Sequence, residues 1–190
     1  VGTTIYRPPY SPLSFSAIAG RSTYEYYDPT RKTSVHSWHL KNGAVFEDVG
    51  QWKRPWYFKK TANETMFDAV QRESKQLRKA AGILDGSTLG KIEIKGKGAL
   101  EFMNLIYTNA FTKMKPMSAR YVLMLGEDGM VKDDGIVCKI NNNHFIATTT
   151  TGGAAKVLSD MEEYLQTEWP HLEVYLNSIT EQFSTFNISG

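Results

Sequence analysis

The middle of the chain contains three candidate strands that are separated only by tight turns. The first, over residues 121–125, is followed by Glu127-Asp128-Gly129, a turn sequence typical of β-hairpins. The second covers 130–140, and an Asn-Asn-Asn turn at 141–143 leads into the third over 144–150. Turns this short join antiparallel neighbours, because a parallel connection needs roughly a dozen or more residues. The pattern therefore requires an antiparallel sheet at the centre of the fold.

Helical patterns precede and interrupt these strands. Thr65 with Asp68 three residues later forms a capping box, and Gly82 is placed to end the helix that begins there. In a further strand Ile92 and Ile94 share one face, which predicts that this face is buried. Hairpin-joined strands with helices between them indicate an α+β fold with a mostly antiparallel sheet and flanking helices. The remaining predicted elements are strands over 89–95, 172–179 and 181–189 and helices over 99–106 and 152–166.

The start of the chain differs from the rest. The proline-rich run at 7–12 cannot be a regular helix, because proline removes a donor and forces the residue before it to be extended. We therefore divide the chain into an N-terminal arm with little periodic structure, 1–62, and a main domain, 63–190. The arm carries aromatic side chains that are expected to pack on the main domain or a neighbouring chain rather than on nucleic-acid bases: Trp52, Trp56 and Tyr57.

The composition excludes several classes of protein. With 22 Lys and Arg against 20 Asp and Glu, the net charge of +2 gives no overall basic field for nucleic acid. The single cysteine, Cys138, excludes an internal disulfide and is expected to be an inert core residue. No apolar run reaches the ~18 residues of a membrane span. The chain lacks an initiator Met and a signal pattern and stops within a predicted strand, so we expect a cytoplasmic protein, here a fragment truncated at its C-terminus.

Two adjacent aspartates, Asp133 and Asp134, lie in the second strand of the hairpin. Adjacent strand residues point to opposite faces, and Asp134 shares its face with apolar residues that include Ile136 and Cys138. We therefore expect Asp134 to face an apolar interior, where an ionised carboxylate is costly unless it is hydrogen-bonded. Such a residue is a candidate functional acid. The alternative is a structural aspartate that accepts backbone N–H bonds, and the pattern does not decide between the two.

Other candidate sites are weaker. The threonine run that ends in Thr151-Gly152-Gly153 opens a helix, where an anion can bind, but we favour β-branched strand residues with Thr151 as the N-cap. His36 and His39 give two metal ligands without a third of fitting spacing, so we expect structural histidines and no metal site. Neither glycine-rich nucleotide motif, Gly-x-Gly-x-x-Gly or Gly-x-x-x-x-Gly-Lys-Ser/Thr, occurs.

Six segments, in order along nearly the whole chain, match a known family. They lie at 46–57, 82–92, 106–109, 124–131, 148–153 and 165–170, and the most specific contains Gln-Trp-Lys-Arg-Pro-Trp-Tyr. These segments resemble the alpha subunits of heterotetrameric sarcosine oxidases, in the aminomethyltransferase-like region that is related to the glycine-cleavage T-protein. The resemblance implies a folate-binding domain whose later strands and C-terminal barrel lie outside this chain.

The resemblance implies a role in the oxidative demethylation of sarcosine. In that family the folate domain captures the one-carbon unit on tetrahydrofolate, giving 5,10-methylenetetrahydrofolate. FAD belongs to the beta subunit, FMN to the alpha–beta boundary and NAD to another part of the alpha subunit. The implied partners are therefore folate and the beta, gamma and delta subunits, with no nucleic acid and no membrane, and the redox step is expected elsewhere in the complex.

The resemblance also implies site residues. The family's functional aspartate is the second of its Asp-Asp pair and falls on Asp134, the implied catalytic residue. The folate pocket is implied to include Tyr121, thirteen positions earlier, and Leu89, where many relatives have Met. Thr148 and Thr150 stand where the T-protein has Val and Asn, fourteen and sixteen positions after the aspartate.

Two alternative functions remain open at this point. One is a flavin-independent aminomethyltransferase or folate-dependent demethylase, which the sarcosine-oxidase-like aromatic segment disfavours. The other is a non-catalytic interaction domain that has kept the fold and lost the folate, which the replacements at Thr148 and Thr150 allow.

Overall fold

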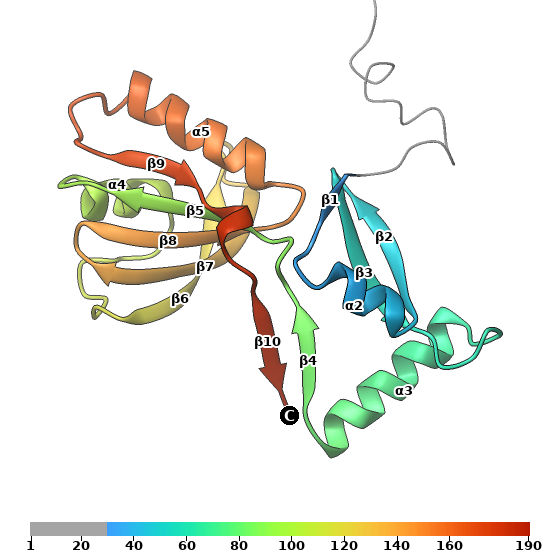
Figure 1. Ribbon diagram of the computed structural model, residues 1–190. Coiled ribbons are helices and arrows are strands. Elements are labelled where there is room, and N and C mark those ends of the chain that lie inside the picture. Colours follow the sequence, from blue (N-terminus) through green and yellow to red (C-terminus); the bar gives the residue numbers. More distant parts are fainter. Residues whose placement is uncertain (1–29) are drawn as a thin grey trace, which may run out of the picture.

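The computed structural model describes residues 30–190 (Figure 1). Its helices are α2 (His36–Lys41), α3 (Met66–Lys79), α4 (Ala99–Ile106) and α5 (Ala154–Thr167), with a 3₁₀ turn η2 (Thr180–Gln182). Its strands are β1 (Arg31–Lys32), β2 (Ala44–Val49), β3 (Trp52–Phe58), β4 (Gly82–Asp85), β5 (Gly90–Lys95), β6 (Ser118–Leu125), β7 (Val131–Asn141), β8 (His144–Thr149), β9 (Tyr175–Ser178) and β10 (Phe186–Ser189). This mixture confirms the predicted α+β class. No helix within residues 30–190 is long and apolar enough to cross a membrane.

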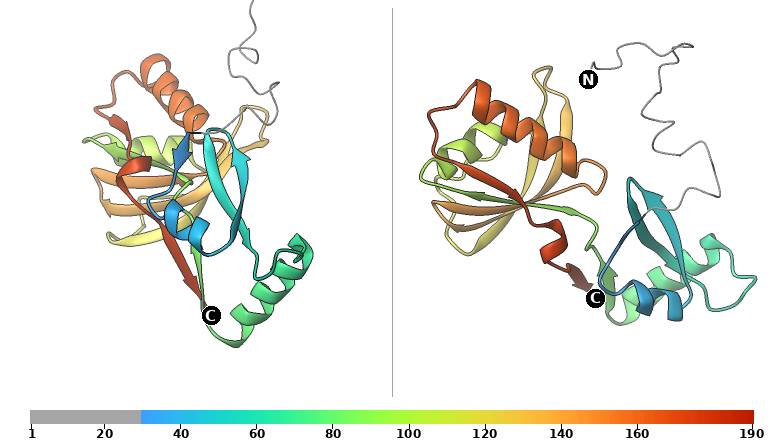
Figure 2. Two further views of the ribbon diagram at one scale, coloured as in Figure 1. Left: turned by 45° about the vertical axis from the view of Figure 1, so that its right-hand side comes forward. Right: turned by 45° about the horizontal axis from the view of Figure 1, so that its top comes forward.

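A five-stranded sheet in the order β6-β7-β8-β5-β9 carries the main core. Every pair in it is antiparallel, as predicted. Helices α4 and α5 lie on the same side of this sheet (Figure 2). Ile92 and Ile94 of β5 are buried there, which confirms the face predicted for this strand. Between the sheet and the helices lie the large core side chains Phe102, Met103, Phe111, Phe145 and Met161.

The hairpin β6–β7 has the predicted turn at 127–129, but its register contains a bulge. Met124 pairs with Asp133, whereas Leu125 pairs with Val131, so Lys132 is an extra residue in β7. A bulge shifts the alternation of side chains by one residue. If side chains are assigned to alternate faces by counting from the turn, the residues of β7 beyond the bulge are therefore placed on the wrong face.

Residues 31–58 form a small sheet, so the prediction of an arm with little periodic structure was wrong for this part of the chain. Strands β2 and β3 make an antiparallel hairpin, and the two residues of β1 pair with β3 in parallel. Pro55 lies in β3 at a break in register, where Trp56 is the extra residue. Proline is tolerated at such bulges. The predicted proline-rich run at 7–12 lies outside the described residues.

The three aromatic residues predicted to need a packing surface have different environments. Trp52 and Tyr57 are buried, and the Arg31 guanidinium carbon lies 4.2 Å from the centre of the Trp52 ring, a cation–π contact. Trp56, in contrast, is 52% exposed. The first two therefore stabilise the small sheet itself, while Trp56 remains on the surface.

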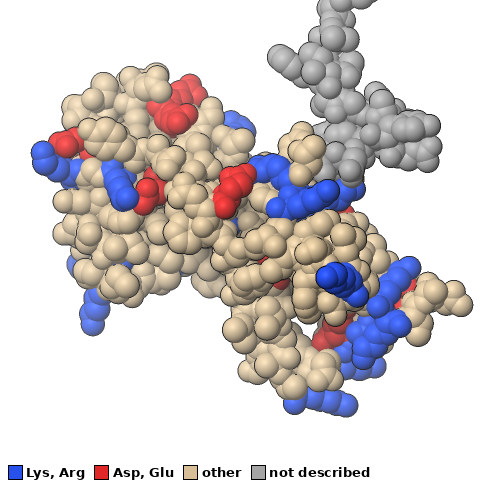
Figure 3. All heavy atoms as spheres, in the orientation of Figure 1, with Lys and Arg blue, Asp and Glu red and all other residues tan. Residues whose placement is uncertain are grey.

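Helix α3 begins as predicted but ends earlier. Thr65 Oγ1 accepts the Asp68 N–H at 3.2 Å and donates to Asp68 Oδ2 at 2.6 Å, which confirms the capping pair. The helix ends at Lys79, and Gly82 opens strand β4 instead of ending the helix. Lys and Arg side chains gather toward the lower right of Figure 3, the side that α3 occupies in Figure 1. The apolar stripe of α3 is exposed: Met66, Phe67, Val70 and Leu77.

Strand β4 pairs antiparallel with β10, and this ribbon lies between the large sheet and the N-terminal elements (Figure 1). Polar contacts tie the N-terminal elements to it. His39 Nε2 of α2 lies 2.7 Å from Asp85 Oδ2 at the end of β4, and both side chains are almost fully buried. Ser34 Oγ lies 2.6 Å from Ser184 Oγ. Arg31 forms an ion pair with Glu181.

Asp85 is expected to make folding stability depend on acidic pH. Burial by itself raises the pKa of Asp85, but hydrogen bonds from Ser87 and His39 outweigh it and hold the pKa below its ordinary value of 3.8. The carboxylate therefore stabilises the fold above that value, and the contribution is lost as the pH falls through the lower folded-state pKa. Asp85→Asn is expected to cost about 2 kcal/mol of unfolding free energy at pH 7.

Chemical denaturation of the wild type and of Asp85→Asn between pH 7 and pH 3 measures this effect. The difference between them should shrink below pH 3.8. The control is Asp48→Asn, since Asp48 is a more exposed carboxylate paired with Lys53 at 3.2 Å. It should cost less than about 1 kcal/mol throughout. A difference at Asp85 that stays constant with pH would contradict the assignment.

Candidate functional site

The side of the five-stranded sheet away from α4 and α5 carries Glu93 and other charged side chains at its β5 end. Its β6–β8 part presents mainly apolar residues and the carboxylate of Asp134 to the surface. We call this part the open face and define it by Tyr121, Leu123, Asp134, Ile136 and Thr148. The β6 members alternate with buried core residues, and the pairings Tyr121–Ile136 and Leu123–Asp134 set the β7 members beside them. Thr148 of β8 alternates in the same way with buried neighbours.

Asp133, and not Asp134, is the buried carboxylate of the pair. Asp133 is 7% exposed and points to the side of α4 and α5, whereas Asp134 is exposed on the open face. The prediction that Asp134 faces the interior was therefore wrong. Its face does hold apolar residues, but the helices cover the opposite face, which includes Lys139. That lysine tolerates burial because its ammonium donates to the Phe111 carbonyl at 3.0 Å.

Asp134 lies among apolar and aromatic side chains. Its direct cross-strand partner is Leu123, and Tyr121 is the partner of Ile136, two residues further along β7. Direct partners have Cβ atoms about 4.5–5.5 Å apart and diagonal ones about 7–8 Å. Tyr121 is 81% exposed, so its ring is accessible to a ligand. Asp134 and Tyr121, two of the predicted site residues, are therefore diagonal neighbours on one surface.

The Asp133 carboxylate holds the loop between β8 and α5. Thr150 donates to it twice, from Oγ1 to Oδ1 at 2.6 Å and from its backbone N to Oδ2 at 3.2 Å. The same Thr150 oxygen accepts the Gly153 N–H at 3.1 Å. Burial, reinforced by the negative charge of Asp133, raises the pKa of Tyr107, which keeps that phenol neutral. The Thr150 hydroxyl thus contacts Asp133, on the opposite side of β7 from the Asp134 side chain.

Thr148 approaches β7 closely at the residue after Asp134. Its Oγ1 accepts the Ile136 N–H at 2.8 Å. A Cβ atom on Gly135 would lie only 2.0 Å from the Thr148 carbonyl oxygen, so that position has room for glycine alone. Thr148 is therefore fixed beside the strand that carries Asp134.

Leu89, the remaining predicted pocket residue, lies directly before β5. That strand is separated from β7 by β8. The neighbouring Lys91 pairs with Thr148 and is buried, and its Nζ donates to the carbonyls of Leu89 at 2.8 Å and of Ser87 at 3.1 Å. Burial lowers the pKa of Lys91, although the charges of Asp85 and Glu181 oppose the shift. Leu89 is thus half-buried and held at the β5 end of the site, two strands away from Asp134.

The weaker candidates have structural environments. The N-cap of α5 is Gly153, so the prediction of Thr151 as N-cap was wrong; Thr151 is buried with its hydroxyl 2.9 Å from that of Thr88. Among residues 30–190, no group of three or more His, Cys, Asp and Glu is arranged to hold a metal ion. Cys138 is half-buried on the side of β7 that also carries Ile136, so its prediction as a core residue was wrong.

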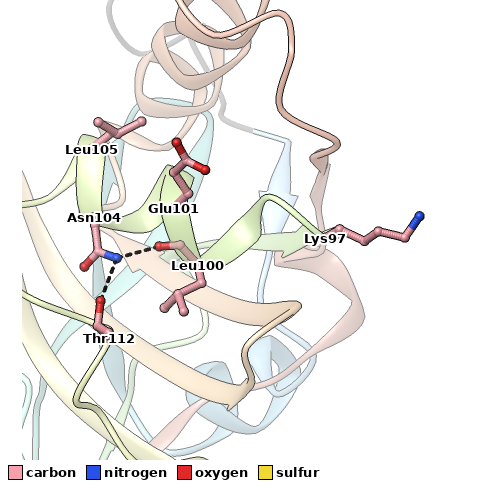
Figure 4. A pocket seen from close by; sticks show the side chains of 6 residues that line it. All are labelled: Lys97, Leu100, Glu101, Asn104, Leu105 and Thr112. Atoms are coloured by element: carbon pink, nitrogen blue, oxygen red, sulfur yellow. Dashed lines mark hydrogen bonds between the residues drawn. The ribbon is translucent and has the colours of Figure 1, made fainter.

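A hollow of about 410 Å³ lies along α4 (Figure 4). The amide of Asn104 in its wall already donates to the Leu100 carbonyl at 2.8 Å and to Thr112 Oγ1 at 3.3 Å. Lys97 extends away from it (Figure 4). The hollow lies on the helix side of the sheet, opposite Asp134.

Three features of the site were not predicted from the sequence. The partnership of Leu123 with Asp134 is hidden by the bulge in β7. The bond of Asp133 to Thr150 joins residues 17 positions apart, which no local pattern reveals. Gly135 did carry a signal, since a glycine inside a strand marks a close backbone approach.

Known proteins resemble this chain in sequence and in fold. Residues 35–190 match the model of the GCVT N-terminal domain. The whole chain is 54% identical to sarcosine oxidase subunit alpha of Corynebacterium sp. (strain U-96) and 46% identical to that of Rhizobium meliloti (strain 1021). It spans 20% and 19% of the length of these two proteins.

A solved structure has a similar fold. Glycine cleavage system aminomethyltransferase T from Bartonella henselae superposes with a TM-score of 0.72, covering 84% of this chain and 40% of that one at 21% identity. The predicted aminomethyltransferase-like architecture and the resemblance to sarcosine oxidase alpha subunits are thereby confirmed. With the family model matched from residue 35 to residue 190, the chain belongs to the GCVT N-terminal domain family.

Proposed function

We propose that the open face binds tetrahydrofolate and that Asp134 assists the transfer of a one-carbon unit to it. The observation that carries this proposal is the diagonal pairing of the exposed Asp134 carboxylate with the accessible Tyr121 ring, beside the apolar side chains of Leu123 and Ile136. Membership of the GCVT N-terminal domain family supports a folate-related one-carbon role.

The residues of the open face fit the chemistry of a reduced folate. Its flat, partly aromatic body can stack on the Tyr121 ring and lie on Leu123 and Ile136. Its N–H groups need an acceptor, which the Asp134 carboxylate supplies. Thr148 closes the β8 side of this surface, and Leu89 is proposed to contact the ligand from the β5 end. Thr150 is engaged by Asp133, so its proposed contribution is indirect.

Asp134 is proposed to act on charge and protons. Bound tetrahydrofolate would supply the weakly nucleophilic nitrogen that takes up the one-carbon unit. The carboxylate orients that nitrogen, accepts the proton it loses and stabilises the positive charge that develops nearby. Its exposure on the open face keeps it accessible to the ligand.

The wider role is proposed from the relatives, of which this chain spans about a fifth. We infer that the one-carbon unit comes from the oxidative demethylation of sarcosine and leaves as 5,10-methylenetetrahydrofolate. Oxidation, with FAD, FMN and NAD, is proposed to occur elsewhere in a complex with beta, gamma and delta subunits. A cytoplasmic location stays a prediction.

Calorimetric titration of the full-length protein with folinic acid, a stable mimic of tetrahydrofolate, tests the binding site. The wild type should bind saturably, and Asp134→Ala should bind at least about ten-fold more weakly, the loss of roughly one charge-assisted hydrogen bond. Glu127→Ala is the matched control, because Glu127 is an exposed carboxylate in the turn of the same hairpin.

Each outcome decides between the functions considered. Equal weakening by both variants would contradict a specific role for Asp134. No binding by the wild type would favour the non-catalytic interaction domain. Binding by a protein that purifies without flavoprotein subunits would favour the flavin-independent transferase.

A further inference from the structure

The buried carboxylate of Asp133 has no part in the chemistry proposed for Asp134, although it is the adjacent residue. It satisfies its charge through the backbone N–H and the hydroxyl of Thr150, at 3.2 Å and 2.6 Å. The Thr150 oxygen then accepts the Gly153 N–H at 3.1 Å. These bonds join β7 to the first turn of α5, which begins at Ala154. We call the three residues Asp133, Thr150 and Gly153 the latch.

The latch is closely packed at its glycine. A Cβ atom on Gly153 would lie 2.8 Å from Asp133 Oδ1 and 2.7 Å from Thr150 Oγ1. Gly153 has an ordinary helical backbone with φ −83°, so glycine is required here for space and not for conformation. The adjacent Gly152 is different, because a Cβ there meets nothing within 4 Å. The two glycines therefore form a natural matched pair for mutation.

The latch sits two residues from the open face. Thr148 belongs to that face and is bonded to the Ile136 N–H, while Thr150 is bonded to Asp133. The segment 148–150 is thus fastened to β7 on both sides of Asp134, by one bond before it and one after it. If Thr150 is displaced from Asp133, the Thr148 bond and the close approach at Gly135 still hold this segment to β7. On its other side, Thr148 and Thr149 stay paired with β5.

We infer that Asp133 is a positioning residue that fixes the 148–153 loop so that Thr148 and Asp134 form one binding surface. The two aspartates thereby have different roles. Asp134 contacts the ligand, and Asp133 positions the 148–153 loop from the helix side of the sheet. This inference rests on the proposed function, because its consequence is read as folate binding. It adds a residue whose carboxylate never contacts the ligand.

The test compares Gly153→Ala with Gly152→Ala in the full-length protein. Two measurements are made: hydrogen–deuterium exchange of the peptide that covers 148–153 without ligand, and the dissociation constant for folinic acid. Gly153→Ala should speed exchange in this peptide and weaken binding by roughly ten-fold, which is the loss of about one charge-assisted hydrogen bond. Gly152→Ala should leave both measurements at wild-type values, because its methyl group enters open space.

Variants at the other two latch residues separate positioning from general destabilisation. Asp133→Asn and Thr150→Val should each weaken binding, and their combination should weaken it no further, since they break the same contact. Thr150→Ser keeps the hydroxyl and should bind folinic acid as the wild type does, in contrast to Thr150→Val. Val137→Ala, which opens a cavity on the same face of β7, should lower stability without changing the dissociation constant.

Separate results overturn the inference and the proposed function. Unchanged exchange at 148–153 in Gly153→Ala and Asp133→Asn would overturn the latch, whatever the folate result. Equal loss of binding in Val137→Ala and Asp133→Asn would reduce Asp133 to a stabilising residue. Absence of binding by the wild type would overturn the proposed function and also the role of this loop in folate binding.

Discussion

Asp134→Asn is expected to slow capture of the one-carbon unit by about 10²–10⁴-fold, the range for loss of a general acid–base group. The amide keeps the shape of the side chain and its place opposite Leu123, but it cannot accept a proton or stabilise a developing positive charge. If oxidation occurs elsewhere in the complex, the rate of sarcosine oxidation should stay at the wild-type value. The assembled enzyme would then release formaldehyde in place of 5,10-methylenetetrahydrofolate.

The measurement is the partition of product between free formaldehyde and the folate adduct, together with the rate of oxygen consumption. Asp128→Asn serves as control, because it changes another exposed carboxylate near the tip of the same hairpin. Its product partition should match the wild type. A parallel collapse of sarcosine oxidation in Asp134→Asn would show that the proposed division of labour is wrong.

Elements whose burial follows from local alternation could be predicted from the sequence. Strand β5 is an example, since Ile92 and Ile94 alternate with the charged Lys91, Glu93 and Lys95, and only one face can be apolar. The hairpin turn at 127–129 and helix α4 likewise depend on residues within a few positions of each other. For such segments local pattern and tertiary packing agree.

The orientation of the two aspartates could not be predicted in this way, because both faces of β7 contain apolar residues. Ile136 and Cys138 lie on one face and Val137 on the other, so counting apolar residues favours the wrong side. Burial is decided by where α4 and α5 pack, and those helices come from distant parts of the sequence. Lys139 also lies on the covered face, although a lysine is rarely buried unless its ammonium has a partner.

The N-terminal sheet was missed for a related reason. Pro55 and Gly50 interrupt the alternation of 44–58, and a proline inside a strand normally argues against one. In the structure the break in register around Phe46 and Pro55 absorbs the missing donor. The family resemblance, by contrast, selected Asp134 without any reference to burial, so that choice did not depend on the mistaken face.

Among substitutions that add one methyl group near the site, Gly135→Ala is expected to lower the free energy of unfolding most. Its Cβ would lie 2.0 Å from the Thr148 carbonyl oxygen and 2.8 Å from the carbonyl carbon, and both are backbone atoms that cannot rotate away. Strand β8 must therefore separate from β7 at this point. Overpacking of this kind costs about 3 kcal/mol or more. For a chain of this length that corresponds to a fall of roughly 6–12 °C in Tm.

Thermal unfolding of Gly135→Ala beside Gly152→Ala measures the effect, since the second variant adds the same methyl group where nothing lies within 4 Å. Gly152→Ala should stay within about 2 °C of the wild type. Because the Thr148 bond to Ile136 and the position of Asp134 both depend on this strand contact, folate binding should fall together with Tm. A Gly135→Ala protein with wild-type stability would contradict the close approach of β7 and β8 on which the open face depends.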